Sequence, residues 1–152
     1  MFDIRIDDLS GEPIRDLLRR HAEGMLEASP PGACHFFDID RLKDPSVTVW
    51  SVWDGNELAG CGALHEIEAT HGELKSMRTH DLHLGKGVGR AVLAHIVAEA
   101  RRRGYRRLSL ETGRGEPFAA AIHLYDSFGF SDCGPFGDYT ESDFSLYLTL
   151  EL

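Results

Sequence analysis

Three glycines alternate with other residues in the stretch Gly85-Lys-Gly-Val-Gly89, directly before a run of apolar residues at helical spacing. Glycine has no Cβ, so the backbone can take left-handed angles there and a ligand can approach it closely. The apolar spacing predicts a helix that begins inside the glycines and ends before Gly104. A helix N-terminus carries amides without partners and the positive end of the helix dipole. The stretch is therefore predicted to bind an anion, most simply phosphate.

Two common phosphate-binding motifs do not fit this stretch. The dinucleotide fingerprint requires a glycine where Arg90 stands, and the P-loop requires serine or threonine after its lysine, whereas Lys86 precedes Gly87. The stretch resembles the acetyl-CoA loop of the GNAT superfamily of N-acyltransferases, usually Arg/Gln-x-x-Gly-x-Gly/Ala, with Leu84 in place of the long polar residue and the last glycine at Gly89.

Residues 121–130 resemble a second signature of that superfamily, a helix that contains a leucine-tyrosine pair, here Leu124-Tyr125, and ends in Gly-Phe, here Gly129-Phe130. The two signatures stand in the family's order within residues 72–133, which makes a chance likeness a poor explanation. Weaker likenesses to bacterial members of the YsnE type occur at residues 78–80, 110–113 and 135–137.

The spacing of apolar residues along the chain predicts the strands and helices that must position these residues. It predicts strands at residues 2–7, 47–53, 58–64, 72–79, 106–112 and 144–150, helices at 13–26, from the glycines to 103, and at 118–128, and a further short strand around 130–133. Residues 33–44 hold at most one helical turn at 39–43 and form either a lid over the substrate or a plain connector.

The predicted order gives an α/β (α+β) fold in one domain, residues 1–152. It has a mixed sheet with helices on both faces. The resemblance implies a GNAT-like, mostly antiparallel sheet of about six or seven strands.

The resemblance also implies roles for residues of this chain. Tyr125 would protonate or hydrogen-bond the departing sulfur of CoA, and Glu73 would act as general base, with Glu111, then Glu66 or Glu68, as alternatives. The residues expected to bind acetyl-CoA are Met77, Thr79, Leu84, Gly85, Lys86, Gly87, Val88, Gly89, Arg90 and Phe118. Phe118 stands where relatives often have an asparagine.

These roles predict an acetyl-CoA-dependent N-acetyltransferase that moves an acetyl group to a primary amine by direct attack in a ternary complex. A small-molecule amine with an apolar body is expected, because aromatic residues recur in the surrounding segments: Phe36, Phe37, Trp50, Trp53, Phe136 and Tyr139. A protein amine is the other acceptor. The rival function is a non-catalytic module with the same fold that binds or senses acyl-CoA.

Charge and composition exclude several classes of binding partner. A net charge of −9 argues against nucleic acid, although residues 73–114 hold ten of the sixteen Lys and Arg against four acids. No segment suggests a membrane span or signal peptide, so a cytoplasmic protein is expected, with a homodimer possible by resemblance. Cys34, Cys61 and Cys133 fit free thiols, and the spacing of His65, His71, His80 and His83 matches no metal motif, so no metal is expected.

Overall fold

Seven strands and four helices make up a computed structural model that describes residues 1–32 and 38–152. The strands are β1 (Asp3–Ile6), β2 (Val47–Asp54), β3 (Glu57–Glu68), β4 (His71–Thr79), β5 (Arg107–Gly113), β6 (Ser131–Asp132) and β7 (Ser145–Glu151). The helices are α1 (Glu12–Ala28), α2 (Ile39–Leu42), α3 (Val88–Arg102) and α4 (Ala119–Ser127), and two 3-10 turns are η1 (Asp81–His83) and η2 (Glu116–Phe118).

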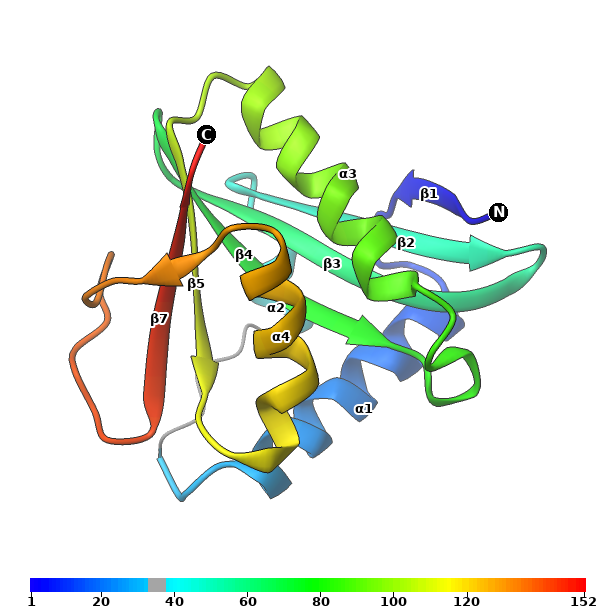
Figure 1. The fold of residues 1–152 in the computed structure, drawn as a ribbon. Coiled ribbons are helices and arrows are strands. Elements are labelled where there is room, and N and C mark those ends of the chain that lie inside the picture. The colour runs from blue at the N-terminus through cyan, green and yellow to red at the C-terminus, as the bar shows by residue number, and fades with distance from the viewer. Residues whose placement is uncertain (33–37) are drawn as a thin grey trace.

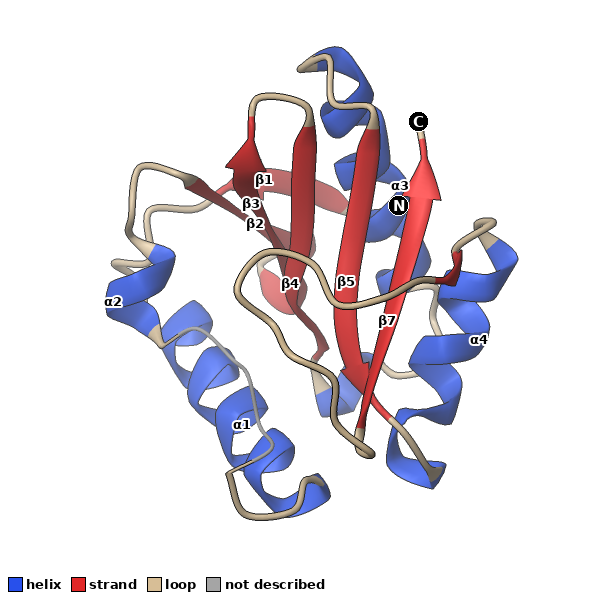
Figure 2. Cartoon of the chain, turned by 90° about the vertical axis from the view of Figure 1, so that its left-hand side faces the viewer, coloured by secondary structure: helices blue, strands red, loops and turns tan. Residues whose placement is uncertain are grey.

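The strands form one sheet in the order β1-β2-β3-β4-β5-β7-β6. Every neighbouring pair is antiparallel except β4 and β5, which run parallel because α3 connects them. Figure 2 shows α1 and α2 on one side of this sheet and α3 and α4 on the other. The predicted mixed, mostly antiparallel sheet with helices on both faces is confirmed.

Most predicted elements occur within a few residues of their expected ends. The exceptions are β3, which continues to Glu68, and the two 3-10 turns, which the periodicity did not indicate. The short strand expected near residue 131 is β6, and the helical turn expected at 39–43 is α2. Residues 33–37, which include Cys34, Phe36, Phe37 and the start of the predicted lid or connector, lie outside the described residues.

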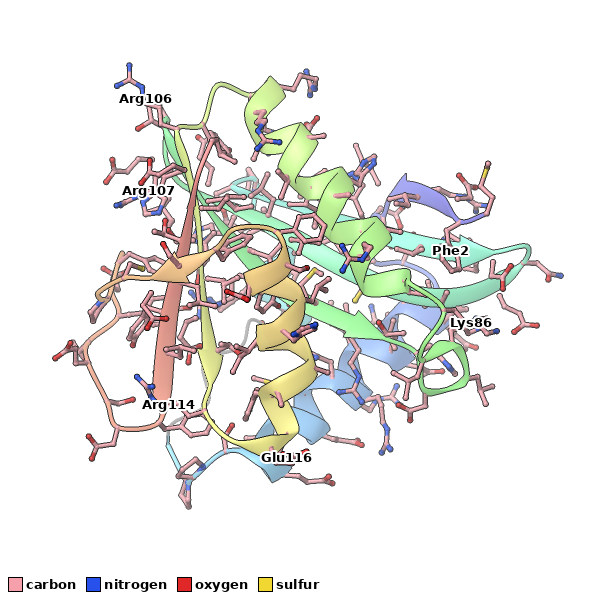
Figure 3. All side chains as sticks on the ribbon, viewed as in Figure 1. Phe2, Lys86, Arg106, Arg107, Arg114 and Glu116 are labelled. Carbon is pink, nitrogen blue, oxygen red and sulfur yellow. The ribbon has the colours of Figure 1, made fainter. Side chains whose placement is uncertain are left out.

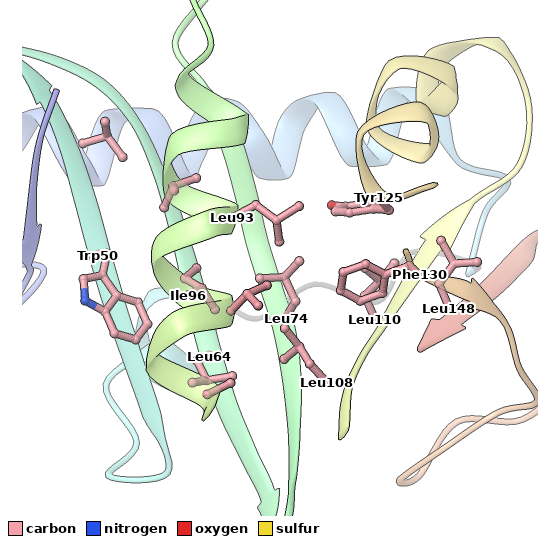
Figure 4. Packing of buried hydrophobic residues seen from close by; sticks show 14 of the residues in the cluster. Trp50, Leu64, Leu74, Leu93, Ile96, Leu108, Leu110, Tyr125, Phe130 and Leu148 are labelled. Carbon is pink, nitrogen blue, oxygen red and sulfur yellow. The ribbon is translucent and has the colours of Figure 1, made fainter. Parts of the chain in front are cut away.

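Each face of the sheet has its own apolar core. On one face α3 and α4 pack through Leu93, Ile96 and Tyr125 against the strands, as Figure 4 shows. On the other face α1 contributes Ile14 and Leu17 to a second cluster. Burying apolar side chains on both faces fixes where each helix end lies, which is what positions the glycine turn and Tyr125.

Candidate active site

The parallel strands β4 and β5 separate soon after they begin. Their ladder pairs residues His71–Glu73 with Arg107–Ser109 and goes no further, whereas β5 stays paired with β7 as far as Gly113. Figure 1 shows the two strands diverging from one end of the sheet. The backbone groups of β4 beyond Glu73 therefore face an opening, and a cavity of about 510 Å³ lies there, lined by α1, β4, β5 and α4.

A bulge shapes β4 inside this opening. The register of β4 against β3 shifts opposite Cys61–Ala63, and Ser76 takes a left-handed backbone with φ 54°. The buried Cys61 thiol donates a hydrogen bond to the carbonyl of Ser76 at 3.3 Å, and burial raises the pKa of this thiol to about 12. Cys61 thus supports the bulge and is not a thiolate nucleophile at neutral pH.

The glycine turn has the backbone that its sequence predicts. Gly85 and Gly87 have φ of 76° and 86°, and a Cβ added at either would meet nothing within 4 Å. The amide of Ala91 donates to the carbonyl of Gly87 at 3.0 Å, which leaves the amides of residues 88–90 without a partner inside α3. No side chain caps this end of α3, and its first turn has no acid, so the turn presents open amides beside open space.

A glycine on β3 lets α3 begin this close to the sheet. A Cβ on Gly60 would lie 2.6 Å from Val88 Cγ1 and 2.8 Å from the carbonyl oxygen of Arg78. Because one of these neighbours is backbone, it cannot rotate away. Gly60 thus positions the start of α3, a role that the sequence reasoning did not identify; a lone glycine within a strand pattern was its only signal.

Lys86 and Arg90, the two cations expected near the phosphates, each contact other side chains of the protein. Lys86 Nζ lies 3.4 Å from His83 Nδ1, while Arg90 donates to Ser127 Oγ at 3.2 Å and its guanidinium lies 5.4 Å from the centre of a phenylalanine ring. Figure 3 shows Lys86 at the glycine turn and Arg106 and Arg107 at the opposite end of the sheet. The basic segment 73–114 is therefore spread over the molecule and does not form one basic patch at the glycine turn.

Tyr125 of α4 lies across the cavity from β4. Its side chain is buried and borders the cavity, and Figure 4 shows its hydroxyl directed toward Leu93 of α3. Within residues 1–32 and 38–152 this hydroxyl has no hydrogen-bond partner. Burial raises the pKa of Tyr125 to about 12, so at neutral pH it carries a proton that it can donate in a hydrogen bond.

Phe118 also lines the cavity, at the start of α4. It is buried, with its ring centre 5.5 Å from that of Phe144, and it occupies the space that a Cβ on Gly113 would need. Leu84 lines the cavity too, but most of its side chain is exposed. Met77, Thr79 and Gly89, which were predicted to bind the cofactor, border the same cavity.

Glu73 lies in a buried polar network next to the cavity. Its carboxylate accepts a hydrogen bond from the Tyr139 hydroxyl at 2.5 Å and lies 3.1 Å from His65 Nδ1 and 3.4 Å from Lys75 Nζ. The Lys75 ammonium also donates to the Tyr139 hydroxyl at 2.9 Å. Burial raises the pKa of Tyr139 and lowers that of Lys75, although Glu73 opposes the second effect. Among the described residues, Lys75 and Glu111 line the cavity and Glu73 does not.

The histidines are distributed over separate contacts. His71 Nε2 lies 2.7 Å from Ser109 Oγ, and His83 Nε2 lies 3.2 Å from a carboxylate oxygen of Glu57. No group of three His, Cys, Asp or Glu side chains in the described ranges is placed to hold a metal ion. Nor does any helix in those ranges have the length and apolarity to cross a membrane.

The described residues thus place open amides at the N-terminus of α3, the separated edges of β4 and β5, and the buried Tyr125 phenol around one cavity. Residues 12–130 match the acetyltransferase (GNAT) family, and the chain belongs to this family.

Similar proteins support the same assignment. The chain is 50% identical to the uncharacterised N-acetyltransferase YsnE of Bacillus subtilis (strain 168), over 98% of this chain and 99% of that protein. It is 47% identical to the uncharacterised N-acetyltransferase YedL of Escherichia coli (strain K12), over 100% of this chain and 96% of that protein. A GNAT family acetyltransferase from Elizabethkingia anophelis, solved with acetyl-CoA bound, shares the fold with a TM-score of 0.70 and 18% identity over 99% of this chain and 98% of that chain.

The predicted family and its YsnE-type branch are therefore confirmed, and the chain is an acyltransferase with acetyl-CoA as donor.

Proposed function

We propose that this enzyme transfers the acetyl group of acetyl-CoA to the primary amine of a small molecule, by direct attack in a ternary complex. The observation that carries this proposal is the single cavity of about 510 Å³ that joins the β4–β5 opening to Tyr125. Ligand pockets span about 300–1,000 Å³. A cavity in this range that must hold both the acetylated arm and the acceptor favours a small acceptor over a protein chain. The free thiols of Cys61 and Cys133 favour the reducing cytoplasm as its compartment.

The cofactor is proposed to lie along the α3–α4 side of the opening. The pyrophosphate would accept hydrogen bonds from the amides of Val88, Gly89 and Arg90, at the positive end of the α3 dipole. The pantetheine arm would pair with the unpaired backbone of β4 near Met77 and Thr79, in the manner of an added strand. Leu84 and Phe118 would contact the arm through apolar surface.

The chemistry follows from this placement. The neutral amine attacks the thioester carbonyl, a tetrahedral intermediate forms, and the C–S bond breaks with its electron pair leaving on sulfur. Backbone N–H groups of the bulged β4 would stabilise the oxyanion, and the Tyr125 hydroxyl would donate to the departing sulfur. The proton lost by the ammonium passes to a carboxylate or to water. The second N–H proton, lost as the amide forms, replaces the proton that Tyr125 gives to sulfur, so the products are an amide, CoA thiol and one proton.

Glu111 is the carboxylate that we assign to contact the acceptor. It lines the cavity near the end of β5, whereas Glu73 does not line the cavity and its carboxylate lies in the network with Tyr139 and Lys75. Glu73 would then act through Lys75 and Tyr139, whose positions it fixes. The prediction that Glu73 itself takes the proton is the competing assignment, and kinetics of the two Gln variants separates them.

Binding is tested first by calorimetric titration with acetyl-CoA, using ATP and NAD as controls. Gly87→Asp and Gly87→Asn form a matched pair, because both residues tolerate a left-handed backbone and cap helices about equally well. They differ in one negative charge beside the expected pyrophosphate. We expect the Asp variant to bind acetyl-CoA about tenfold more weakly than the Asn variant or worse.

Turnover is then followed by thiol release with a panel of primary amines. Equal affinities of the two Gly87 variants, or equal binding of acetyl-CoA, ATP and NAD, would remove the glycine turn from the binding mode. Thioester binding without acetylation of any primary amine would refute N-acetyl transfer.

A further inference from the structure

Two residues that border the cavity on the α1 side each have a buried polar atom without a partner among the described residues. His21 of α1 and Ser76 of the β4 bulge are each 9% exposed, and both border the cavity. Neither His21 Nδ1 nor Ser76 Oγ makes a hydrogen bond with any of the described residues. Leaving a buried polar group unpaired costs about 1–3 kcal/mol. Two such residues on one cavity wall favour a ligand with a polar group, which would supply the missing hydrogen-bond partners.

Arg78 brings a guanidinium to the same corner. It follows the bulge on β4 and reaches α1 at Gly24, where an added Cβ would lie 3.0 Å from Arg78 Nη1. Gly24 stands one turn after His21, in the interior of α1, where glycine is less favourable than alanine by about 0.5–1 kcal/mol. The space that it leaves for Arg78 is a physical reason for a glycine at this position.

The corner carries a positive potential. Burial, Arg78 and then Lys75 lower the pKa of His21 to about 4, so the imidazole is neutral at pH 7. Lys75 is paired with Glu73, which leaves the Arg78 guanidinium as the main positive charge of the corner. The carboxylate of Asp81 lies 3.6 Å from Arg78, but it is half-exposed and offsets the guanidinium only in part.

An acid lies elsewhere on the wall of the same cavity. Glu111 on β5 borders the cavity, and its charge acts on the pKa of Lys75. The acceptor side therefore has a corner with one guanidinium and two unpaired buried polar groups, and a wall with a carboxylate. A small molecule with an ammonium group and an anionic group matches these two charges, with its anionic group at the corner and its ammonium group at the carboxylate.

We propose that the acceptor is an amino carboxylate, whose carboxylate binds Arg78, His21 and Ser76 while its amine faces Glu111 and the thioester. This assignment rests on the proposed N-acetyl transfer and specifies its substrate class. A monoanionic carboxylate fits better than a phosphate because the corner offers one guanidinium, partly neutralised by Asp81, and two neutral side chains that can donate. The apolar body of the acceptor would lie against Met25 and Ala28 of α1.

The experiment compares matched acceptors on the full chain with saturating acetyl-CoA. Each of the common amino acids is assayed beside its methyl ester and its decarboxylated amine, for example phenylalanine, phenylalanine methyl ester and 2-phenylethylamine. The ester has the less basic amine and therefore more neutral nucleophile at pH 7. If amine basicity alone governed the rate, the ester would react faster than the acid. We expect at least one amino acid to exceed both of its partners in kcat/KM by about tenfold or more.

Substitutions at the corner test whether it causes the preference for the amino acid over its ester and its decarboxylated amine. Arg78→Gln is expected to raise KM for the amino acid by about tenfold or more and to leave KM for the decarboxylated amine unchanged. Arg19→Gln, which removes an exposed arginine from the same helix that carries His21, is the charge control. Ser76→Gly removes the hydroxyl while keeping a residue that accepts φ 54°, and it tests the corner even if the Arg78 variant folds poorly.

The outcomes separate the two proposals. Acetylation of amines that lack a carboxylate as well as or better than the amino acids overturns the amino-carboxylate assignment and leaves N-acetyl transfer intact. The amino-carboxylate assignment is also overturned if other amines react but no amino acid is acetylated. An unchanged KM for the amino acid in both the Arg78 and Ser76 variants would overturn it as well. Failure to bind acetyl-CoA, or to acetylate any amine, overturns the proposed function itself.

Discussion

Acid should destabilise this protein through one histidine. Burial, Arg78 and Lys75 disfavour the charged form of His21, which lowers its pKa in the folded state to about 4 from the 6.5 of a histidine exposed to water. Between these values the unfolded chain binds a proton that the folded chain does not, so the free energy of unfolding falls as the pH drops from about 6.5 toward 4. The stability is fully present above the unfolded pKa and is lost on acidification.

The size of the effect follows from the two pKa values. At pH 5 the unfolded histidine is almost fully protonated and the folded one almost fully neutral, which lowers the free energy of unfolding by about 2 kcal/mol relative to pH 7.5. For a chain of this length that corresponds to about 4–8 °C in Tm. Acidic groups that also titrate contribute equally to the wild type and to a variant at position 21, so the difference between them isolates His21.

Urea unfolding at pH 7.5, 6 and 5 measures this difference. His21→Gln should lose about 2 kcal/mol less than the wild type between pH 7.5 and pH 5. The buffers should lack carboxylates, because a bound acetate would stabilise the proposed corner and mask the effect. His123→Gln, at an exposed position on α4, is the control for removing a histidine. Parallel pH profiles for the wild type and His21→Gln would refute the buried, neutral imidazole.

The remaining predictions concern catalysis and packing. Tyr125→Phe should lower kcat by about 10²-fold or more, with acetyl-CoA affinity measured by calorimetry nearly unchanged; a parallel loss of affinity would show a packing role instead. Gly60→Ala should lower the free energy of unfolding in urea by about 1–3 kcal/mol and weaken acetyl-CoA binding, because its Cβ would displace the start of α3. Gly134→Ala, where a Cβ meets open space, should do neither. Glu111→Gln should lower kcat/KM at neutral pH about 10²-fold and regain activity at higher pH, where the amine is already neutral; if Glu73→Gln shows this profile instead, Glu73 is the base.

Local chemistry explains why much of the fold, including the backbone of the glycine turn, could be predicted from the sequence. The left-handed angles of Gly85 and Gly87 follow from the residue type, and the start of α3 follows from apolar spacing over four turns. The placement of Tyr125 beside the opening was expected from a signature within one helix. Each of these depends on contacts between neighbours in sequence, which a pattern can record.

The acceptor side depends on contacts that no local pattern records. The Glu73 carboxylate is engaged by Tyr139, 66 residues away, a contact that the resemblance behind its predicted role as base does not record. Ser76 gives no signal of a left-handed backbone, since a non-glycine residue there is held by the surrounding sheet. His21 continues the apolar spacing of α1 that Ile14, Leu17 and Leu18 begin, so its spacing alone is that of a core position. Only the separation of β4 from β5 turns that position into a cavity wall.

The pattern along α1 then separates stability from function. Its first two turns bury Ile14, Leu17 and Leu18 in the core, whereas the next inward-facing positions are His21 and the helix-interior Gly24. A helix selected for stability alone would continue with leucine, which has a similar size and no unpaired buried nitrogen. His21→Leu should therefore raise the free energy of unfolding at pH 7.5 by about 1 kcal/mol while raising KM for the amino-carboxylate acceptor. Opposite signs of these two changes on one substitution would identify His21 as a residue kept for binding. A loss of stability together with the loss of binding would make it a structural residue of α1.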